Sequence, residues 1–489
     1  MEKTRIKMTI SFLNTLKTNS DKTAFHIDGK DYSYNTFYQK VNTIASIFSD
    51  KQQQKIIVAT NNNIETYASI IAIWLTGNSY IPINFDTKNE RFTAQLKVID
   101  ADIILSSECI NGIEIINSSN LKETQSELPN IQIAPNDLAY ILFTSGTTGT
   151  PKGVPISYQN LDAFVDSFLS LGYGFSEKDN FLQMADLTFD MSIISFLIPL
   201  CVGATITTID NSEIKYLATL QALLERDITV LTTAPATLQL LEPYYSEINL
   251  EQLKYTFVGA EAFYHTTAKE WQECAPNSQI INLYGPSEGG IFTSAYSLPS
   301  KGIKDHNGIV SIGKPIKNLE LYIVNEDGIL AEEGEIWISG KQVFNSYLNT
   351  SDNKNSFSDL TVNGKIITCY KSGDIAYQDE EGFLFYCGRK DNQVKIQGKR
   401  VELAEIEFYA AKMSIQFNPL AICYQSQFGS TQIALFIEKQ ISKDLLINHL
   451  KENLPDYMIP SKIIQLDSLP LNKNQKTDRK ALQLMLQNN

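Results

Sequence analysis

The sequence is poor in the residues from which most metal centres and hydrolase triads are built. It has only four histidines, which lie far apart, and six cysteines that form no C-x-x-C pair. A histidine-based metal site, a catalytic triad, a zinc site and a disulfide framework therefore have little support. The scattered cysteines are typical of reduced thiols, and we expect a cytoplasmic protein.

Long apolar runs and an excess of positive charge are also absent. No apolar run approaches the roughly 18 residues of a membrane-spanning helix, and residues 1–16 are too polar for a secretory signal. Acidic residues outnumber basic ones by 55 to 41, so the net charge is −14. This balance argues against nucleic acid and against an anionic membrane surface as partners.

The length and the change in pattern along the chain predict two domains. A chain of 489 residues is too long for one ordinary core. Helical periodicity alternates with short β-branched strands at first, and short strands with turn signals follow from about residue 310. We predict an α/β fold with a large N-terminal domain (1–390) of α/β layers that includes a β-rich subdomain. A small mobile α+β C-terminal domain (391–489) would follow it. Expected elements include a strand at 55–60 and helices at 64–76 and 443–453.

The loop after the expected strand 140–143 is the most informative segment. Its glycines let the backbone turn tightly and approach an anion, its hydroxyls and backbone N–H groups can donate, and Lys152 adds a positive charge. The spacing is not that of a Walker A loop, and a polar surface loop would have the same composition. We interpret it as a triphosphate-binding loop consisting of Thr144, Ser145, Gly146, Thr147, Thr148 and Gly149.

Four further segments carry side chains suited to a nucleotide. Segment 282–288 turns after an apolar strand and exposes an aromatic ring, a hydroxyl and a carboxylate, which suit a nucleobase, a phosphate and Mg²⁺. Asp374 follows a glycine at an expected strand end and is a candidate for holding ribose hydroxyls. A basic segment at 388–403 and a charged segment at 469–481 complete the set. Taken singly, each also fits a turn, a solvated hairpin or a charged tail.

Together, and in this order, the five segments resemble the adenylate-forming superfamily. Within it, residues 25–482 resemble the amino-acid adenylation enzymes of nonribosomal peptide synthesis and the D-alanine–carrier-protein ligases. Segments 75–83, 189–192 and 454–460 resemble these amino-acid enzymes more than the coenzyme A ligases. Gly259-Ala260-Glu261 departs from the Cys-Gly-Glu pattern of the D-alanine ligases, which weakens that assignment.

The resemblance implies a role for each segment. The phosphate loop and Lys152 would hold the β- and γ-phosphates of ATP, and Lys476 would bridge the substrate carboxylate and the α-phosphate. Glu288 would bind Mg²⁺, and Asp391 would be the hinge of the small domain. Adenine, phosphate and ribose would be contacted by Tyr284, by Ser287, and by Asp374 with Arg389 nearby, respectively.

The resemblance also implies an amino-acid pocket. Asp190 would pair with the α-ammonium group of the substrate. None of the expected wall residues is charged, which predicts an uncharged and largely apolar substrate side chain; its size and stereochemistry stay open. The wall would consist of Met191, Ile194, Thr232, Phe257, Gly259, Leu283, Ile291 and Phe292.

The sequence thus predicts a stand-alone, monomeric ligase that uses ATP and Mg²⁺. It would form an aminoacyl-AMP and transfer the aminoacyl group to the phosphopantetheine thiol of a separate carrier protein. We expect a separate carrier because the sequence ends at Asn489, shortly after Lys476. The alternatives are a D-alanine–carrier-protein ligase, an acyl- or aryl-coenzyme A ligase and a catalytically silent ATP-binding module. In a coenzyme A ligase, Asp190 would lie unpaired beside an apolar substrate, which is costly.

Overall fold

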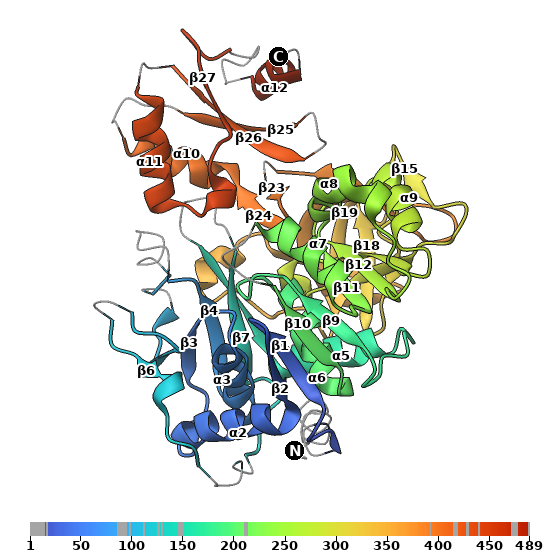
Figure 1. The fold of residues 1–489 in the computed structure, drawn as a ribbon. Coiled ribbons are helices and arrows are strands. Elements are labelled where there is room, and N and C mark those ends of the chain that lie inside the picture. Colours follow the sequence, from blue (N-terminus) through green and yellow to red (C-terminus); the bar gives the residue numbers. More distant parts are fainter. Residues whose placement is uncertain are drawn as a thin grey trace. The chain divides into compact units, whose positions relative to one another are not determined.

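The structure is a computed structural model of the chain, and its ribbon is shown in Figure 1. It describes residues 15, 18–85, 95, 96, 99–110, 113–124, 128, 131–144, 151–209, 214–391, 393–413, 419–426, 430–438, 441–470 and 478–487. The chain divides into two compact units. We call them the large unit (Met1–Phe85, Ile99–Leu142 and Gly153–Gly388) and the small unit (Asp86–Val98, Phe143–Lys152 and Arg389–Asn489).

A nine-stranded sheet carries four of the nine residues predicted to bind substrate. Its order is β17 (Lys314–Pro315), β14 (Ser294–Ser297), β13 (Gln279–Tyr284), β12 (Tyr255–Gly259), β11 (Val230–Thr233), β9 (Asn180–Gln183), β10 (Thr205–Thr208), β1 (Thr23–Ile27) and β2 (Lys30–Ser33). Each pair of neighbouring strands between β13 and β1 is parallel, whereas β14 and β2 pair antiparallel with β13 and β1, respectively. Parallel strands of this kind are buried on both faces, which accounts for their apolar sequences.

Helices cover both faces of this sheet. Phe257 and Val258 are neighbours in β12 and therefore point to opposite faces, where they join two different hydrophobic cores. The core around Phe257 includes residues of α5 (Tyr158–Leu169) and α6 (Met191–Val202). The core around Val258 includes residues of α7 (Lys215–Glu225), α8 (Pro235–Leu241) and α9 (His265–Cys274).

A six-stranded sheet holds the N-terminal part of the chain. Its order is β6 (Ile116–Asn117), β5 (Ile103–Ser106), β3 (Lys55–Ala59), β4 (Ser79–Ile83), β7 (Leu138–Thr144) and β8 (Lys152–Ser157). Helices α2 (Tyr34–Ala45) and α3 (Ile64–Leu75) accompany it. Nearly every residue of α3 is buried, as expected for a helix that is apolar all round. The indole N–H of Trp74 in α3 donates to the carbonyl of Ala139 in β7 at 2.9 Å, which anchors the helix on the sheet.

Antiparallel strands form the predicted β-rich part of the large unit. A five-stranded sheet has the order β18 (Leu319–Val324), β19 (Glu333–Gly340), β21 (Lys365–Gln378) and β20 (Phe357–Val362), and β22 (Leu384–Arg389) also pairs with β21. The hairpin β15 (Asp305–His306) and β16 (Ile309–Val310) is separate.

The small unit is an α+β structure with its own core. It contains the hairpin β23 (Gln393–Ile396) and β24 (Lys399–Glu402), and a sheet of β25 (Leu420–Gln425), β26 (Thr431–Ile437) and β27 (Lys462–Gln465). Its helices are α10 (Leu403–Ala411), α11 (Lys443–Asn453) and α12 (Arg479–Gln487). Ile406, Leu435 and Leu446 bring α10, β26 and α11 into one core. In the described part of the chain, no helix has the length and apolar character needed to cross a membrane.

Candidate adenylation site

The turn after β13 has a geometry that admits little variation. A Cβ on Gly285 would lie 2.6 Å from the carbonyl oxygen of Ile291, so only glycine fits there. The backbone N–H of Thr293 donates to the carbonyl of Tyr284 at 2.7 Å and closes the turn. Ile291 has a φ of 77°, which is rare for a β-branched residue. Strain of this kind persists only where the surrounding structure imposes it, and it is frequent at binding sites.

The turn brings Tyr284 to Asp374. The Tyr284 hydroxyl donates to Oδ2 of Asp374 at 2.7 Å, and both side chains are buried. The prediction that Asp374 lies at a strand end is wrong, because it lies inside β21. It follows Gly373, whose φ is 75°, at a bulge in the pairing of β21 with β19. A bulge re-aims side chains, and here it accompanies the turn of the carboxylate toward Tyr284.

Glu288 lies in the same turn, in the short 3-10 helix Ser287–Gly289. Its side chain is fully buried, and the Tyr347 hydroxyl donates to its Oε1 at 2.6 Å. The backbone N–H of Phe344 donates to the Glu288 carbonyl at 2.9 Å. Ser287, the predicted phosphate contact, is partly exposed next to it. One turn therefore carries the predicted adenine, phosphate and metal contacts.

The donor set of this turn fits Mg²⁺ that arrives with a nucleotide. Mg²⁺ prefers oxygen ligands and is usually held by one or two carboxylates together with substrate phosphates. Glu288 supplies such a carboxylate. The described residues contain no group of three or more acidic, histidine or cysteine side chains that could hold a metal ion without help from a substrate.

Half of the predicted pocket wall lies on three neighbouring parallel strands, β11, β12 and β13. The register pairs Thr232 of β11 with Phe257 of β12, and Gly259 of β12 with Leu283 of β13. All four residues are buried. Thr232 Oγ1 is buried without a hydrogen-bond partner among the described residues. Such an atom is uncommon in a folded protein and suits contact with a ligand or water.

Phe292 fills the space beside Gly259. A Cβ on Gly259 would lie 3.0 Å from Cε1 of Phe292 and 3.0 Å from the carbonyl oxygen of Leu283. Phe257 belongs to an aromatic cluster, with its ring 5.3 Å from that of Phe168. The missing side chain at Gly259 therefore does not open a large space.

Asp190 lies just before the first turn of α6, beside two neutral phenols. Burial, and to a smaller degree the Asp190 carboxylate, raises the pKa of Tyr80 and Tyr140 far above the ordinary value. Both phenols are therefore neutral beside Asp190. Met191 and Ile194 follow in α6, partly and fully buried, respectively.

Two predicted residues belong to the small unit, where they pair with each other. The Arg389 guanidinium donates to Asp391 from Nε to Oδ1 at 2.7 Å and from Nη2 to Oδ2 at 2.8 Å. Burial opposes ionisation of Asp391, but the hydrogen bonds and charge of Arg389, together with the backbone N–H of Gln393 and the charge of Arg400, outweigh it and hold the pKa of Asp391 below its usual range.

Several predicted residues lie outside the described part of the chain. Thr144 ends β7 and Lys152 begins β8, so both flanks of the predicted phosphate loop are described. Ser145, Gly146, Thr147, Thr148, Gly149 and Lys476 lie outside the described residues.

Tyr347 and Tyr370 were not identified from the sequence. The Tyr347 hydroxyl reaches Glu288 across 59 positions in the chain, and it lies 3.4 Å from the hydroxyl of Tyr370. Neither residue belongs to a local motif that points to phosphate or metal. Contacts between segments far apart in the chain place Tyr347 beside Glu288, and no signal in a single sequence shows them.

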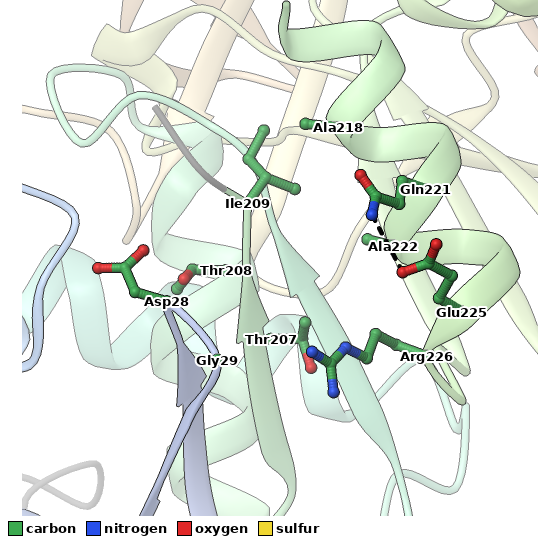
Figure 2. Close-up of a pocket in the computed structure, with 10 residues that line it drawn as sticks. All are labelled: Asp28, Gly29, Thr207, Thr208, Ile209, Ala218, Gln221, Ala222, Glu225 and Arg226. Carbon is green, nitrogen blue, oxygen red and sulfur yellow. Dashed lines mark hydrogen bonds between the residues drawn. The ribbon is translucent and has the colours of Figure 1, made fainter. Parts of the chain in front are cut away.

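A surface groove elsewhere in the large unit contains none of the predicted site residues. Figure 2 shows it between α7, β10 and the turn after β1, with a volume of about 250 Å³. Asp28, Glu225 and Arg226 give its exposed rim charges of both signs. The amide of Gln221 donates to Glu225 at 3.1 Å, so part of this polar surface is satisfied internally. Nothing in this mixed lining selects a ligand.

Known proteins with similar sequences are of two kinds: synthases much longer than this chain, and ligases of about its own length. Gramicidin S synthase 1 of Brevibacillus brevis is 30% identical over 495 residues, which cover 96% of this chain and 44% of that protein. Tyrocidine synthase 3 of Brevibacillus parabrevis is 29% identical and is covered over only 7% of its length. The chain thus spans less than half of these synthases. The D-alanine–D-alanyl carrier protein ligase of Lacticaseibacillus casei is 28% identical, with 94% of this chain and 95% of that protein covered.

Solved structures and a family model agree with this likeness. The Vibrio cholerae adenylation domain AlmE, in complex with glycyl-adenosine-5'-phosphate, superposes with a TM-score of 0.87 at 25% identity over 99% of this chain and 98% of that one. The confirmed fold is therefore the mixed α/β fold of adenylation domains. The family model described as AMP-binding enzyme matches residues 12–348. The chain belongs to the AMP-binding enzyme family, whose members are ATP-dependent, adenylate-forming ligases.

Proposed function

We propose that this protein activates a small uncharged amino acid as its aminoacyl-AMP and transfers it to the phosphopantetheine thiol of a carrier protein. The proposal rests on two features that occur together in the large unit. Asp190 and the uncharged pocket wall suit an amino acid, and the turn after β13 offers Tyr284 and Glu288 to a nucleotide. We further propose that the enzyme acts as a monomer and that its carrier is a separate chain.

The proposed first step joins two anions. A carboxylate oxygen of the amino acid attacks the α-phosphorus of ATP, the bond from that phosphorus to the β-phosphate bridging oxygen breaks, and pyrophosphate leaves. Lys152 and Lys476 would offset the repulsion and the charge that builds up on the phosphoryl oxygens. Mg²⁺, held by Glu288, would supply further charge neutralisation at the phosphates. Asp190 would hold the ammonium group and so orient the carboxylate, a contribution of the kind that positioning makes in other enzymes.

The proposed second step uses the thiol of the carrier. The sulfur attacks the acyl carbon, the bond from that carbon to the phosphate oxygen breaks, and AMP leaves while the thiol proton is released to solvent. The same site would serve both steps after rotation of the small unit about Asp391, because Lys476 and the pantetheine arm would need the same space.

Two observations favour a small substrate side chain. The Phe292 ring occupies the space beside Gly259, so the wall closes where a larger side chain would extend. AlmE, a structural neighbour at 25% identity, was solved with a glycyl adenylate. D-alanine is the second candidate, because a D-alanine–D-alanyl carrier protein ligase matches this chain over nearly its whole length.

ATP–pyrophosphate exchange against a matched panel tests the proposal. The panel pairs glycine, L-alanine and D-alanine with acetate and propionate, which have the same carbon skeletons without the amino group. Phenylalanine, glutamate and lysine probe size and charge. We expect exchange with one of the three small amino acids and little with the others. Equal exchange with propionate and alanine would indicate an acyl-coenzyme A ligase, and nucleotide binding without any exchange would indicate a silent module.

A further inference from the structure

The carboxylate of Glu288 is held by a residue for which neither the sequence nor the proposed reaction provides a role. Tyr347, between β19 and β20, donates its hydroxyl to Glu288 Oε1 at 2.6 Å, and both side chains are buried. Because Glu288 is not exposed at all, protein contacts rather than water set the orientation of its carboxylate.

Tyr347 itself is held firmly. Its backbone N–H donates to Oδ1 of Asn353 at 2.9 Å, and its ring meets that of Phe344 edge to face at 4.9 Å between centroids. The Tyr370 hydroxyl lies 3.4 Å from its own. These contacts restrict both the ring and the hydroxyl of Tyr347, as positioning of a second group requires.

The segment that carries Tyr347 connects two parts of the predicted site. At one end, the backbone N–H of Phe344 donates to the carbonyl of Glu288 at 2.9 Å. At the other end, the backbone N–H of Leu348 donates to the carbonyl of Gly153 at 2.9 Å, directly after Lys152 in β8. The predicted metal ligand and the strand that begins with the predicted phosphate contact are thus tied to one short segment.

We propose that Tyr347 is a positioning residue for metal–nucleotide binding. Its hydroxyl engages one oxygen of Glu288 and so orients the other oxygen toward the Mg²⁺ that accompanies ATP. A neutral hydroxyl does this without cancelling the charge of the carboxylate, as an arginine or lysine would. The inference rests on the proposed function, in which Glu288 binds the metal. It gives Tyr347 the role that hydrogen-bonding partners of metal ligands have elsewhere, where their loss typically weakens metal affinity about 10- to 100-fold.

The test is Mn²⁺ binding by Tyr347→Phe, which removes one hydroxyl and keeps the ring. Mn²⁺ is titrated by electron paramagnetic resonance in the presence of a non-hydrolysable ATP analogue, and binding of the same analogue is measured in EDTA. We expect the apparent dissociation constant for Mn²⁺ to rise about 10- to 100-fold while metal-free analogue binding stays as in the wild type.

Tyr322→Phe is the matched control. The Tyr322 hydroxyl also donates to a glutamate, Oε2 of Glu320, at 2.6 Å, but on the exposed side of the antiparallel sheet. We expect this variant to match the wild type in both measurements. If Tyr347→Phe does not fold, Tyr370→Phe replaces it, and we expect a smaller weakening of Mn²⁺ binding because the Tyr347–Glu288 contact is retained.

The possible outcomes distinguish failure of the role of Tyr347 from failure of the proposed function. Wild-type Mn²⁺ affinity in the folded variant would overturn the positioning role, and so would equal losses with and without metal, which would indicate a structural effect. If the wild-type protein itself shows no metal-dependent binding of the analogue, the proposed function fails and not only the role of Tyr347.

Discussion

The two units hold their carboxylates in chemically different ways. In the large unit, Asp374 accepts a hydrogen bond from the neutral hydroxyl of Tyr284 at 2.7 Å, and both side chains are buried. In the small unit, Asp391 accepts two hydrogen bonds from the guanidinium of Arg389, and half of the Asp391 side chain is exposed. The first arrangement preserves the negative charge of the carboxylate, whereas the second cancels it.

This difference indicates what each carboxylate can do. A carboxylate held by hydroxyls keeps its charge and an oxygen for a metal ion, an ammonium group or a ribose hydroxyl. One that is paired with arginine in a bidentate hydrogen bond has little attraction left for a second cation. On these grounds, we expect Glu288 and Asp374 of the large unit to contact ligands, and Asp391 of the small unit to have a mechanical role.

The largest effect is expected at Asp190. Asp190→Asn keeps the size of the side chain and removes its charge, so an ammonium group in the pocket would lose its counterion. Removing one partner of a buried ion pair typically costs about 3–5 kcal/mol. We expect the KM for the amino acid in pyrophosphate exchange to rise by a corresponding factor, with ATP-analogue affinity unchanged. Wild-type exchange kinetics would show that the amino group is recognised elsewhere.

Lys476→Ala tests whether the small unit supplies a cation to the reaction. Loss of one group that stabilises transition-state charge typically costs about 10²- to 10³-fold in rate. We expect a loss of this size in adenylation, measured in single turnovers, and nearly unchanged transfer from preformed aminoacyl-AMP to the carrier. Equal losses in both half-reactions would contradict a role of Lys476 that is confined to adenylation.

Local pattern predicted much of the scaffold on which these residues lie. The helix expected at 64–76 is α3 (Ile64–Leu75), the one expected at 443–453 is α11 (Lys443–Asn453), and the strand at 55–60 is β3 (Lys55–Ala59). Apolar periodicity and short-range turns determine such elements, so one sequence suffices to find them.

Features that depend on pairing between distant strands were not predictable in the same way. Asp374 was expected at a strand end, because the glycine before it is a common turn signal. In the structure, pairing of β21 with β19 continues past that glycine and leaves a bulge. Tyr347 was not identified because its contact with Glu288 exists only after two segments 59 positions apart have come together in the fold. The roles of the phosphate loop and Lys476 stay predictions.

Tyr284→Phe tests whether a carboxylate that is held by a hydroxyl, rather than by an arginine, depends on that hydroxyl for its stability. It leaves the buried carboxylate of Asp374 without the hydroxyl donor of Tyr284, and losing a hydrogen bond to a charged group costs about 1–3 kcal/mol. We expect a decrease of this size in the free energy of unfolding, measured with urea, together with weaker ATP-analogue binding. Asp374→Asn in the same background is the control, because it removes the charge that the lost hydroxyl had stabilised. If the double variant were no more stable than Tyr284→Phe, the buried charge would not be the cause.

Asp391→Pro tests the mechanical role. Proline fixes φ near −65° and removes a backbone donor, whereas Asp391→Asn removes only the charge. We expect Asp391→Pro to slow one half-reaction about tenfold more than the other, since tenfold corresponds to only about 1.4 kcal/mol of bias between two orientations. Asp391→Asn should leave the ratio of the two rates as in the wild type. A proline variant with the same ratio would mean that the chain does not rotate at this residue.

The smallest effect is expected when the pH is lowered and the Arg389–Asp391 ion pair loses its contribution to stability. The pKa of Asp391 is lowered in the folded protein, because Arg389, the backbone N–H of Gln393 and the charge of Arg400 together outweigh the effect of burial. The pair therefore contributes its full stability above the pKa of an aspartate in the unfolded chain, about 3.9. This contribution is lost as the pH falls through the lower folded-state pKa.

Since half of the Asp391 side chain is exposed, we expect the pair to contribute about 1 kcal/mol or less. Urea unfolding should show Asp391→Asn to be less stable than the wild type by this amount near pH 6, with the difference shrinking below about pH 4. A difference that stays constant to the lowest pH would mean that the variant acts through packing, and the contrast between the two units would then not rest on charge.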